Sequence, residues 1–158
     1  MILPFVFTAL LAGATPATEL AINTHDTAVF ERQLREMGYK IDPFERDGDT
    51  ATSFLRSGND KTAIVLGGCT AGDACEYVVI VSAFEDVLKP PADWVAKMNR
   101  TYDLIKVSTR DTDQALTYSA GIIIDGAPRA TFRHWLERVE SSSADLAQEA
   151  VKAKLVAE

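Results

Sequence analysis

Apolar residues recur at spacings of three and four along three stretches of the chain, and this spacing predicts three helices. The stretches are residues 27–37, 89–103 and 128–157. Gly38 ends the first helix, and Pro90 and Pro91 begin the second, as is usual for glycine and proline at helix ends. In the third stretch, the sequence SSSAD at 141–145 predicts a break followed by a second, shorter helix. The side chains expected to face the core from the third stretch are Phe132, Trp135, Leu136 and Val139.

Shorter stretches rich in β-branched and aromatic residues lie between the helices and predict strands. They cover residues 39–46, 50–57, 61–67, 76–86, 104–111 and 115–125. The sequences DGD and SGND separate the first three, and both are typical of turns between antiparallel strands. The order is therefore helix, four strands, helix, two strands, helix. This order predicts an α+β fold with helices packed on one antiparallel sheet.

The first 17 residues have a different character, because they carry no charged side chain and are mostly apolar as far as Ala14. An apolar run that ends in small residues, here Ala12-Gly13-Ala14, is typical of a signal peptide. The run is too short to span a membrane, which takes about 20 apolar residues. No Lys or Arg precedes it, so a buried N-terminal helix or strand of a cytosolic protein is the alternative. We predict export, with residues 1–17 removed and no stable membrane anchor left afterwards.

Composition limits the partners of the remaining domain. The formal net charge is −7, which makes a nucleic acid an unexpected partner and leaves basic or neutral molecules open. Hydrophobic residues make up 47% of the chain and charged residues 25%, as in an ordinary globular domain. About 140 residues would remain after cleavage, which is enough for one domain with its own core.

Cys69 and Cys75 are the two cysteines of the chain, and they flank the loop between two predicted strands. An even pair of cysteines in an exported protein is usually joined, and Gly67, Gly68 and Gly72 allow the tight backbone that a short closed loop needs. We therefore predict a structural disulfide, which would stabilise the fold by roughly 2–3 kcal/mol. Two free buried thiols, or a redox or metal-binding pair, are the alternatives.

No sequence motif indicates an enzyme, a metal site or a cofactor. The spacing of the cysteines is neither the C-x-x-C of a thioredoxin-like couple nor half of a zinc site. His25 and His134 are far apart in sequence, and each is expected on the protein surface. The acidic sequence ERDGDT lacks the calcium-loop pattern, and the chain has no P-loop or dinucleotide-binding glycine motif.

The order of several short motifs resembles the bacterial YbjN domain family, described as sensory transduction regulators. The resemblance covers about residues 24–140. Its motifs are LREMGYKI, a strand ending in GC, the loop TAGDAC, the strand EYVVIVSAF, the segment MNRTYDLIKVSTRD and the helix GAPRATFRHWLERVE. Met98 stands where the family commonly has Trp, whereas Asn99 and Arg100 keep the rest of that motif.

The resemblance implies a fold similar to that of type III secretion chaperones, which bind extended polypeptide and often dimerise. It implies no enzymatic activity. Together with the predicted signal peptide, the resemblance divides the chain into a signal peptide (1–17), a YbjN-like domain (18–142) and a C-terminal helical tail (143–158).

The predicted function is therefore that of a periplasmic or secreted, non-enzymatic domain that binds a protein or peptide in a regulatory or chaperone-like role. An exposed sheet edge or groove would accept the extended segment. Asn99 and Arg100 are candidate binding residues; the competing interpretation makes them a helix C-cap and a surface ion pair. A homodimer stays open. The alternative function is a thiol–disulfide redox protein that uses Cys69 and Cys75.

Overall fold

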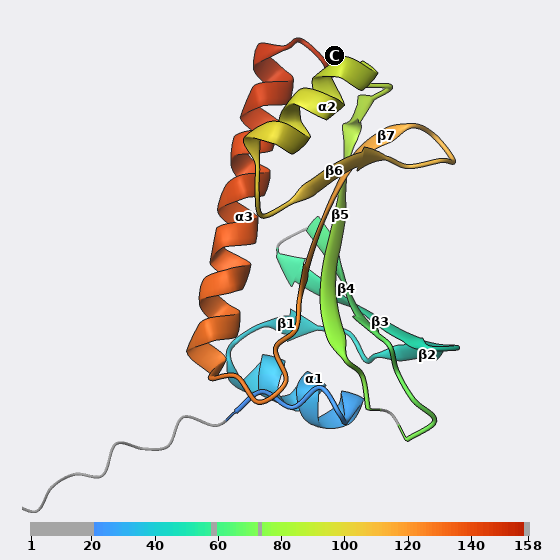
Figure 1. The fold of residues 1–158 in the computed structure, drawn as a ribbon, viewed down its shortest axis with the longest axis vertical. Helices are drawn as coiled ribbons and strands as arrows, with labels where there is room; N and C mark the ends of the chain where they lie inside the picture. Colours follow the sequence, from blue (N-terminus) through green and yellow to red (C-terminus); the bar gives the residue numbers. More distant parts are fainter. Residues whose placement is uncertain (1–20, 58–59, 73, 157–158) are drawn as a thin grey trace, which may run out of the picture.

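The computed structural model describes residues 21–57, 60–72 and 74–156, and these form one antiparallel sheet with three helices (Figure 1). The helices are α1 (Thr27–Glu36), α2 (Ala92–Thr101) and α3 (Arg129–Lys152). The strands are β1 (Lys40–Ile41), β2 (Glu45–Asp47), β3 (Thr50–Ser57), β4 (Asp60–Gly67), β5 (Tyr77–Leu88), β6 (Lys106–Thr109) and β7 (Ala115–Ile122). The α+β prediction is confirmed. The predicted signal peptide lies outside the described residues.

The strands follow the order β1-β3-β4-β5-β7-β6 across the sheet, and β2 also pairs with β3. All of these pairings are antiparallel, so the two halves of the sheet meet at the long strand β5. After β5 the chain passes through α2 to the edge strand β6, and β7 then lies between β5 and β6. None of the described helices is long and apolar enough to cross a membrane.

The predicted strand 39–46 is wrong in one respect, because it forms two short strands, β1 and β2. Pro43 lies between them and has no N–H to contribute to the ladder with β3. Both strands still pair with β3, but in different registers: Ile41 is opposite Leu55, and Glu45 is opposite Thr52. The chain therefore bends at the proline while staying at the edge of the sheet.

The predicted break at 141–145 is also wrong, because α3 continues without interruption for 24 residues. Its buried stripe extends past the serines and comprises Phe132, Trp135, Leu136, Val139, Leu146 and Ala150. These spacings keep one side of the helix on the core, and the gain from burying that side outweighs the weak helix propensity of serine. The predicted boundary between residues 142 and 143 falls inside this helix.

The core lies between the three helices and one face of the sheet. Side chains along β5 alternate, so Val78 and Ile80 are buried whereas Val79 and Val81 are only half-buried. Helix α3 runs the length of the molecule, with α1 beside its first turns and α2 beside its last (Figure 1). At the α1 end, Phe30 packs edge-on against Phe132, and Arg129 forms an ion pair with Glu36.

Candidate functional site

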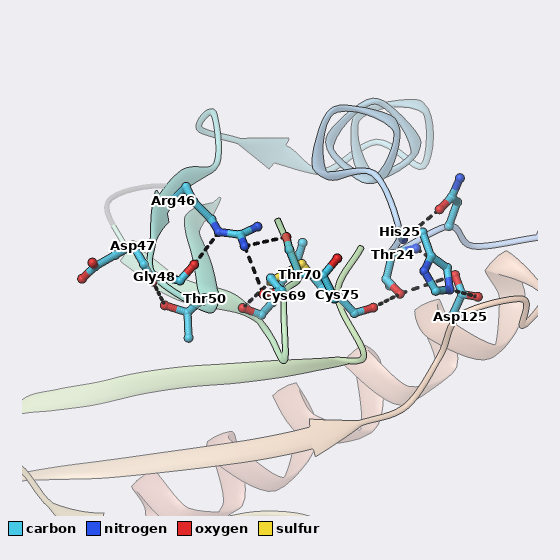
Figure 2. The surroundings of a disulfide bond; sticks show 12 residues. Thr24, His25, Arg46, Asp47, Gly48, Thr50, Cys69, Thr70, Cys75 and Asp125 are labelled. Carbon is cyan, nitrogen blue, oxygen red and sulfur yellow. Dashed lines mark hydrogen bonds and ion pairs between the residues drawn. A yellow bond between two sulfur atoms is a disulfide. The ribbon is translucent and has the colours of Figure 1, made fainter. Parts of the chain in front are cut away.

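Cys69 and Cys75 form the predicted disulfide, which closes the loop between β4 and β5 (Figure 2). The loop needs glycine at two places. Gly68 has φ of +66°, a left-handed conformation that side chains disfavour. A Cβ at Gly67 would overlap the ring of Tyr77 on the facing strand. The two glycines and the disulfide therefore stabilise the same turn.

Polar contacts hold the disulfide loop on the side of β2. The guanidinium of Arg46 donates hydrogen bonds to the carbonyl oxygens of Cys69 and Thr70, at 3.1 and 2.8 Å (Figure 2). The Cys69 N–H donates to the carbonyl of Asp49, in the turn between β2 and β3. One arginine thus links the loop to an edge strand of the sheet.

On its other side the loop is held by the segment that precedes α1. The Thr24 hydroxyl donates to the carbonyl of Cys75 at 2.9 Å, and the Cys75 N–H donates back to the carbonyl of Thr24. The Asp125 carboxylate accepts from the Thr24 N–H and lies 2.9 Å from Nε2 of His25 (Figure 2). His25 is therefore an exposed partner of a carboxylate that anchors the N-terminal segment.

The geometry does not favour the redox alternative. Cys69 is 7% exposed and Cys75 is 1% exposed, so an attacking thiolate would have little access to either sulfur. His134, the second histidine, lines a small cleft between α1 and α3 rather than the loop. Among the described residues, no group of three or more His, Cys, Asp or Glu side chains is placed to hold a metal ion. This part of the molecule has the features of a structural element.

Asn99 binds this chain's own backbone. Its amide nitrogen donates to the carbonyl of Val107 and its amide oxygen accepts from the Val107 N–H, both at 2.8 Å. Val107 is on the edge strand β6, so the side chain takes the place that a neighbouring strand would occupy. The predicted C-cap role is wrong, since Tyr102 caps α2. A side-chain ladder of this kind could not be foreseen from sequence.

Arg100, the other candidate binding residue, is an exposed residue of the same helix. The described part of the chain offers it no ion-pair partner, so the predicted surface ion pair does not form there. Its binding role stays a prediction. The two neighbours in sequence have different environments, and the structure does not join them into one site.

The opposite edge of the sheet is protected in a similar way by α1. Arg35 donates to the carbonyl of Ile41 in β1, and Glu31 accepts from the N–H of Phe44, just before β2. Arg35 and Glu31 also form an ion pair with each other, at 2.6 Å. Helix side chains therefore bind backbone groups at both outer edges, which is a common protection against unwanted strand pairing.

An open groove lies between α3 and the sheet. Its first part, of about 400 Å³, has Leu55, Ile80 and Tyr118 on the sheet and Leu136 and Val139 on the helix. A second hollow of about 760 Å³ shares Thr62, Tyr118 and Glu140 with the first, so the two are continuous. The second hollow extends beyond the end of the β4–β5 pairing, to Phe84 and Ser143. Together they form an elongated groove along α3, which we call the α3 groove.

At the α1 end of this groove, Tyr39 and the ion pair of Asp42 with Arg56 contribute no net charge. Burial raises the pKa of Tyr39, so its phenol is neutral at physiological pH. Asp42 has a lowered pKa because Arg56 donates hydrogen bonds to it, and the two charges compensate.

The far end of the groove has a compensated cluster and two uncompensated charges. Arg110 binds both Glu85 and Asp113, and its hydrogen bonds hold the pKa of Asp113 at about 2. Lys61 and Glu140 form no ion pair with any of the described residues. Lys61 lies above the ring of Phe54, with Nζ 5.9 Å from the ring centre. Of the described residues that line the groove, Lys40, Lys61 and Glu140 form no ion pair, so the groove offers two free cations and one free carboxylate on three different elements.

The family profile described as "Putative bacterial sensory transduction regulator" matches residues 26–151. The chain belongs to the YbjN family. Its fold is similar to that in the crystal structure described as "YbjN, a putative transcription regulator from E. coli", with a TM-score of 0.55 at 12% identity. That similarity covers 83% of this chain and 95% of the E. coli chain. No match was found among curated proteins.

The sequence of this YbjN-family chain did not predict that the residues of the α3 groove lie together. Leu55 and Thr62 lie on neighbouring strands, and Glu140 is more than 70 positions further along the chain. Alternation along the strands could have placed Leu55 and Thr62 on the helix face. The distance between that face and α3 depends on sheet twist and helix direction, which short sequence patterns do not specify.

Proposed function

We propose that this chain is an exported, non-enzymatic domain that binds a protein or peptide in a regulatory or chaperone-like role. The observation that carries the proposal is the α3 groove, which is elongated, open, and lined by aliphatic, aromatic, hydroxyl and charged side chains. Ligand sites commonly combine an apolar lining with a few polar groups that orient the ligand. Membership of a family of regulators agrees with this function.

Export is supported by two observations. The disulfide suits an oxidising compartment, because cytosolic thiols are normally kept reduced. The apolar run in residues 1–17 has the composition of a signal peptide. We therefore propose a periplasmic or secreted protein that meets its partner outside the cytoplasm.

Site-specific photo-crosslinking in the native host tests this function. A photoreactive amino acid at Thr62, inside the α3 groove, is expected to capture a specific polypeptide. The same amino acid at Arg138, an exposed position on the opposite side of α3 from Val139 and Glu140, is the matched control and is expected to capture none. Equal products at both positions, or none at Thr62 across several growth conditions, would count against a binding groove.

A further inference from the structure

Strand β5 continues beyond the end of its pairing with β4, which leaves part of its backbone without a paired strand, while β4 runs on to Asp60 in its pairing with β3. The pairing with β4 ends at Ala63 opposite Val81, whereas the pairing with β7 continues regularly to Phe84 opposite Leu116. The open side closes again at Val87, which forms an isolated antiparallel bridge with Val156 after α3. We call residues 82–86 the open segment of β5.

Alternation of hydrogen bonds across the sheet shows which backbone groups point to the open side. Val107 turns its N–H and carbonyl toward Asn99, and Arg110, three residues on, donates to Ala115 of β7. Ala115 therefore faces β6, and Tyr118, three positions further along, faces β5 instead. Ser82, which is opposite Tyr118, must then face β7.

It follows that Ala83, the next residue of β5, directs its N–H and carbonyl away from β7. On that side β4 has already ended its pairing with β5. None of the hydrogen bonds found among the described residues outside the strand pairings involves the Ala83 backbone. An open N–H and carbonyl at a sheet edge are the groups that bind an added strand.

We propose that the open segment of β5 binds an extended segment of another polypeptide as an added antiparallel strand, with Ala83 as its central hydrogen-bonding residue. The second hollow of the α3 groove lies directly over this segment, since Val81, Ser82, Ala83, Phe84 and Glu85 all line it. The outer edges are less suited to this role, because Asn99 and the Arg35–Glu31 pair already bind backbone groups there.

Charge and polarity on the two faces specify the partner. A residue opposite Ala83 shares its face of the sheet, where Ala63 and Phe54 lie and the uncompensated Lys61 is above the Phe54 ring. The flanking residues of the partner point toward α3, where Tyr118, Ser143 and the uncompensated Glu140 lie. The site therefore fits an alternating segment with basic or hydroxyl residues around an apolar one. The net charge of −7 further favours a basic partner.

A second copy of this chain does not fit the open segment. On one side of it β4 continues past its last pair with β5, Ala63 opposite Val81, and on the other side lies the bridge at Val156, so the edge is recessed between two projecting elements. The same edge in a second molecule would be equally recessed, and two recessed edges cannot pair along their length. The occupant is thus a short extended segment, which deepens the proposed function and rests on it.

The test measures binding of a fluorescent pentapeptide, acetyl-Thr-Lys-Val-Lys-Thr-amide, to the purified protein and two proline variants. Ala83→Pro removes the outward N–H and is expected to weaken binding about tenfold. Thr109→Pro is the matched control, because Thr109 also points away from β7, at the edge β6, and is expected to bind normally. A probe with an ester in place of the valine amide is expected to bind wild type about tenfold more weakly, and this measurement stands if a proline variant fails to fold.

Three results would overturn the inference. These are no binding of the probe up to millimolar concentration, equal binding of the ester and amide probes, and an equal loss of binding in two proline variants that both fold. The crosslinking experiment at Thr62 is independent of all three. If a partner is captured at Thr62 and one of these three results is also found, the proposed function stands and strand addition at β5 is rejected.

Discussion

Asn99 lies on α2, but both hydrogen bonds of its side-chain amide end on β6. The amide satisfies an N–H and a carbonyl of Val107, which would otherwise be left at a partly buried sheet edge. The pair joins the helix to the strand that follows it in sequence. The residue therefore has a structural role that explains its presence without a ligand.

Replacing Asn99 with alanine is expected to lower the free energy of unfolding by about 1–2 kcal/mol, because two hydrogen bonds are lost at the edge. Arg100→Ala is the matched control on the next residue, and it is expected to change stability by no more than about 0.5 kcal/mol. Urea unfolding of the two variants measures both values. A larger loss in Arg100→Ala than in Asn99→Ala would mean that we have misassigned the structural residue of this pair.

At the scale of single elements, α3 shows how tertiary packing decides a helix end. Three serines at 141–143 and Asp145 are weak helix formers, yet Leu146 and Ala150 beyond them are fully buried. A break after Glu140 would expose this part of the stripe, so the helix continues to Lys152.

Leu146→Ala is expected to destabilise the protein by about 2–5 kcal/mol, since it would leave a cavity between the last turns of α3 and the core. Val151→Ala removes a comparable side chain that is 62% exposed, and its effect should stay within about 0.5 kcal/mol. Thermal unfolding of both variants measures the difference. If Leu146→Ala were as stable as Val151→Ala, the end of α3 would contribute little to the core.

The sequence was sufficient for features that depend on local patterns. Phe132, Trp135, Leu136 and Val139 were predicted to face the core and do so, because helical spacing alone determines their common side. The disulfide was predicted from an even pair of cysteines in a protein expected to be exported, at the ends of a loop between two strands. The Asn99 amide pair and the α3 groove could not be predicted, since each depends on the distance between elements that only the assembled fold determines.

The whole chain combines a cross-linked loop with an apolar run in its first 17 residues, and both features bear on where the protein is found. We expect the protein purified from its native host to begin near Thr15 or Thr18 and to carry no free thiol until it is denatured and reduced. Intact mass before and after reduction and alkylation reports both properties in one experiment. A protein that keeps Met1 and has two reactive thiols would contradict export and require a cytosolic function.

The contacts of Thr24 have a consequence for the order of events as the chain is made. Thr24 is hydrogen-bonded to Asp125, about a hundred residues later, and Ile22 exchanges hydrogen bonds with Gly126 and Ala127. The segment around Ile22 and Thr24 can therefore take its final place only after the loop before α3 has been synthesised. Contacts of such long range close late and slow the search for the native state. The nascent chain thus stays incompletely folded until residues 125–127 have emerged.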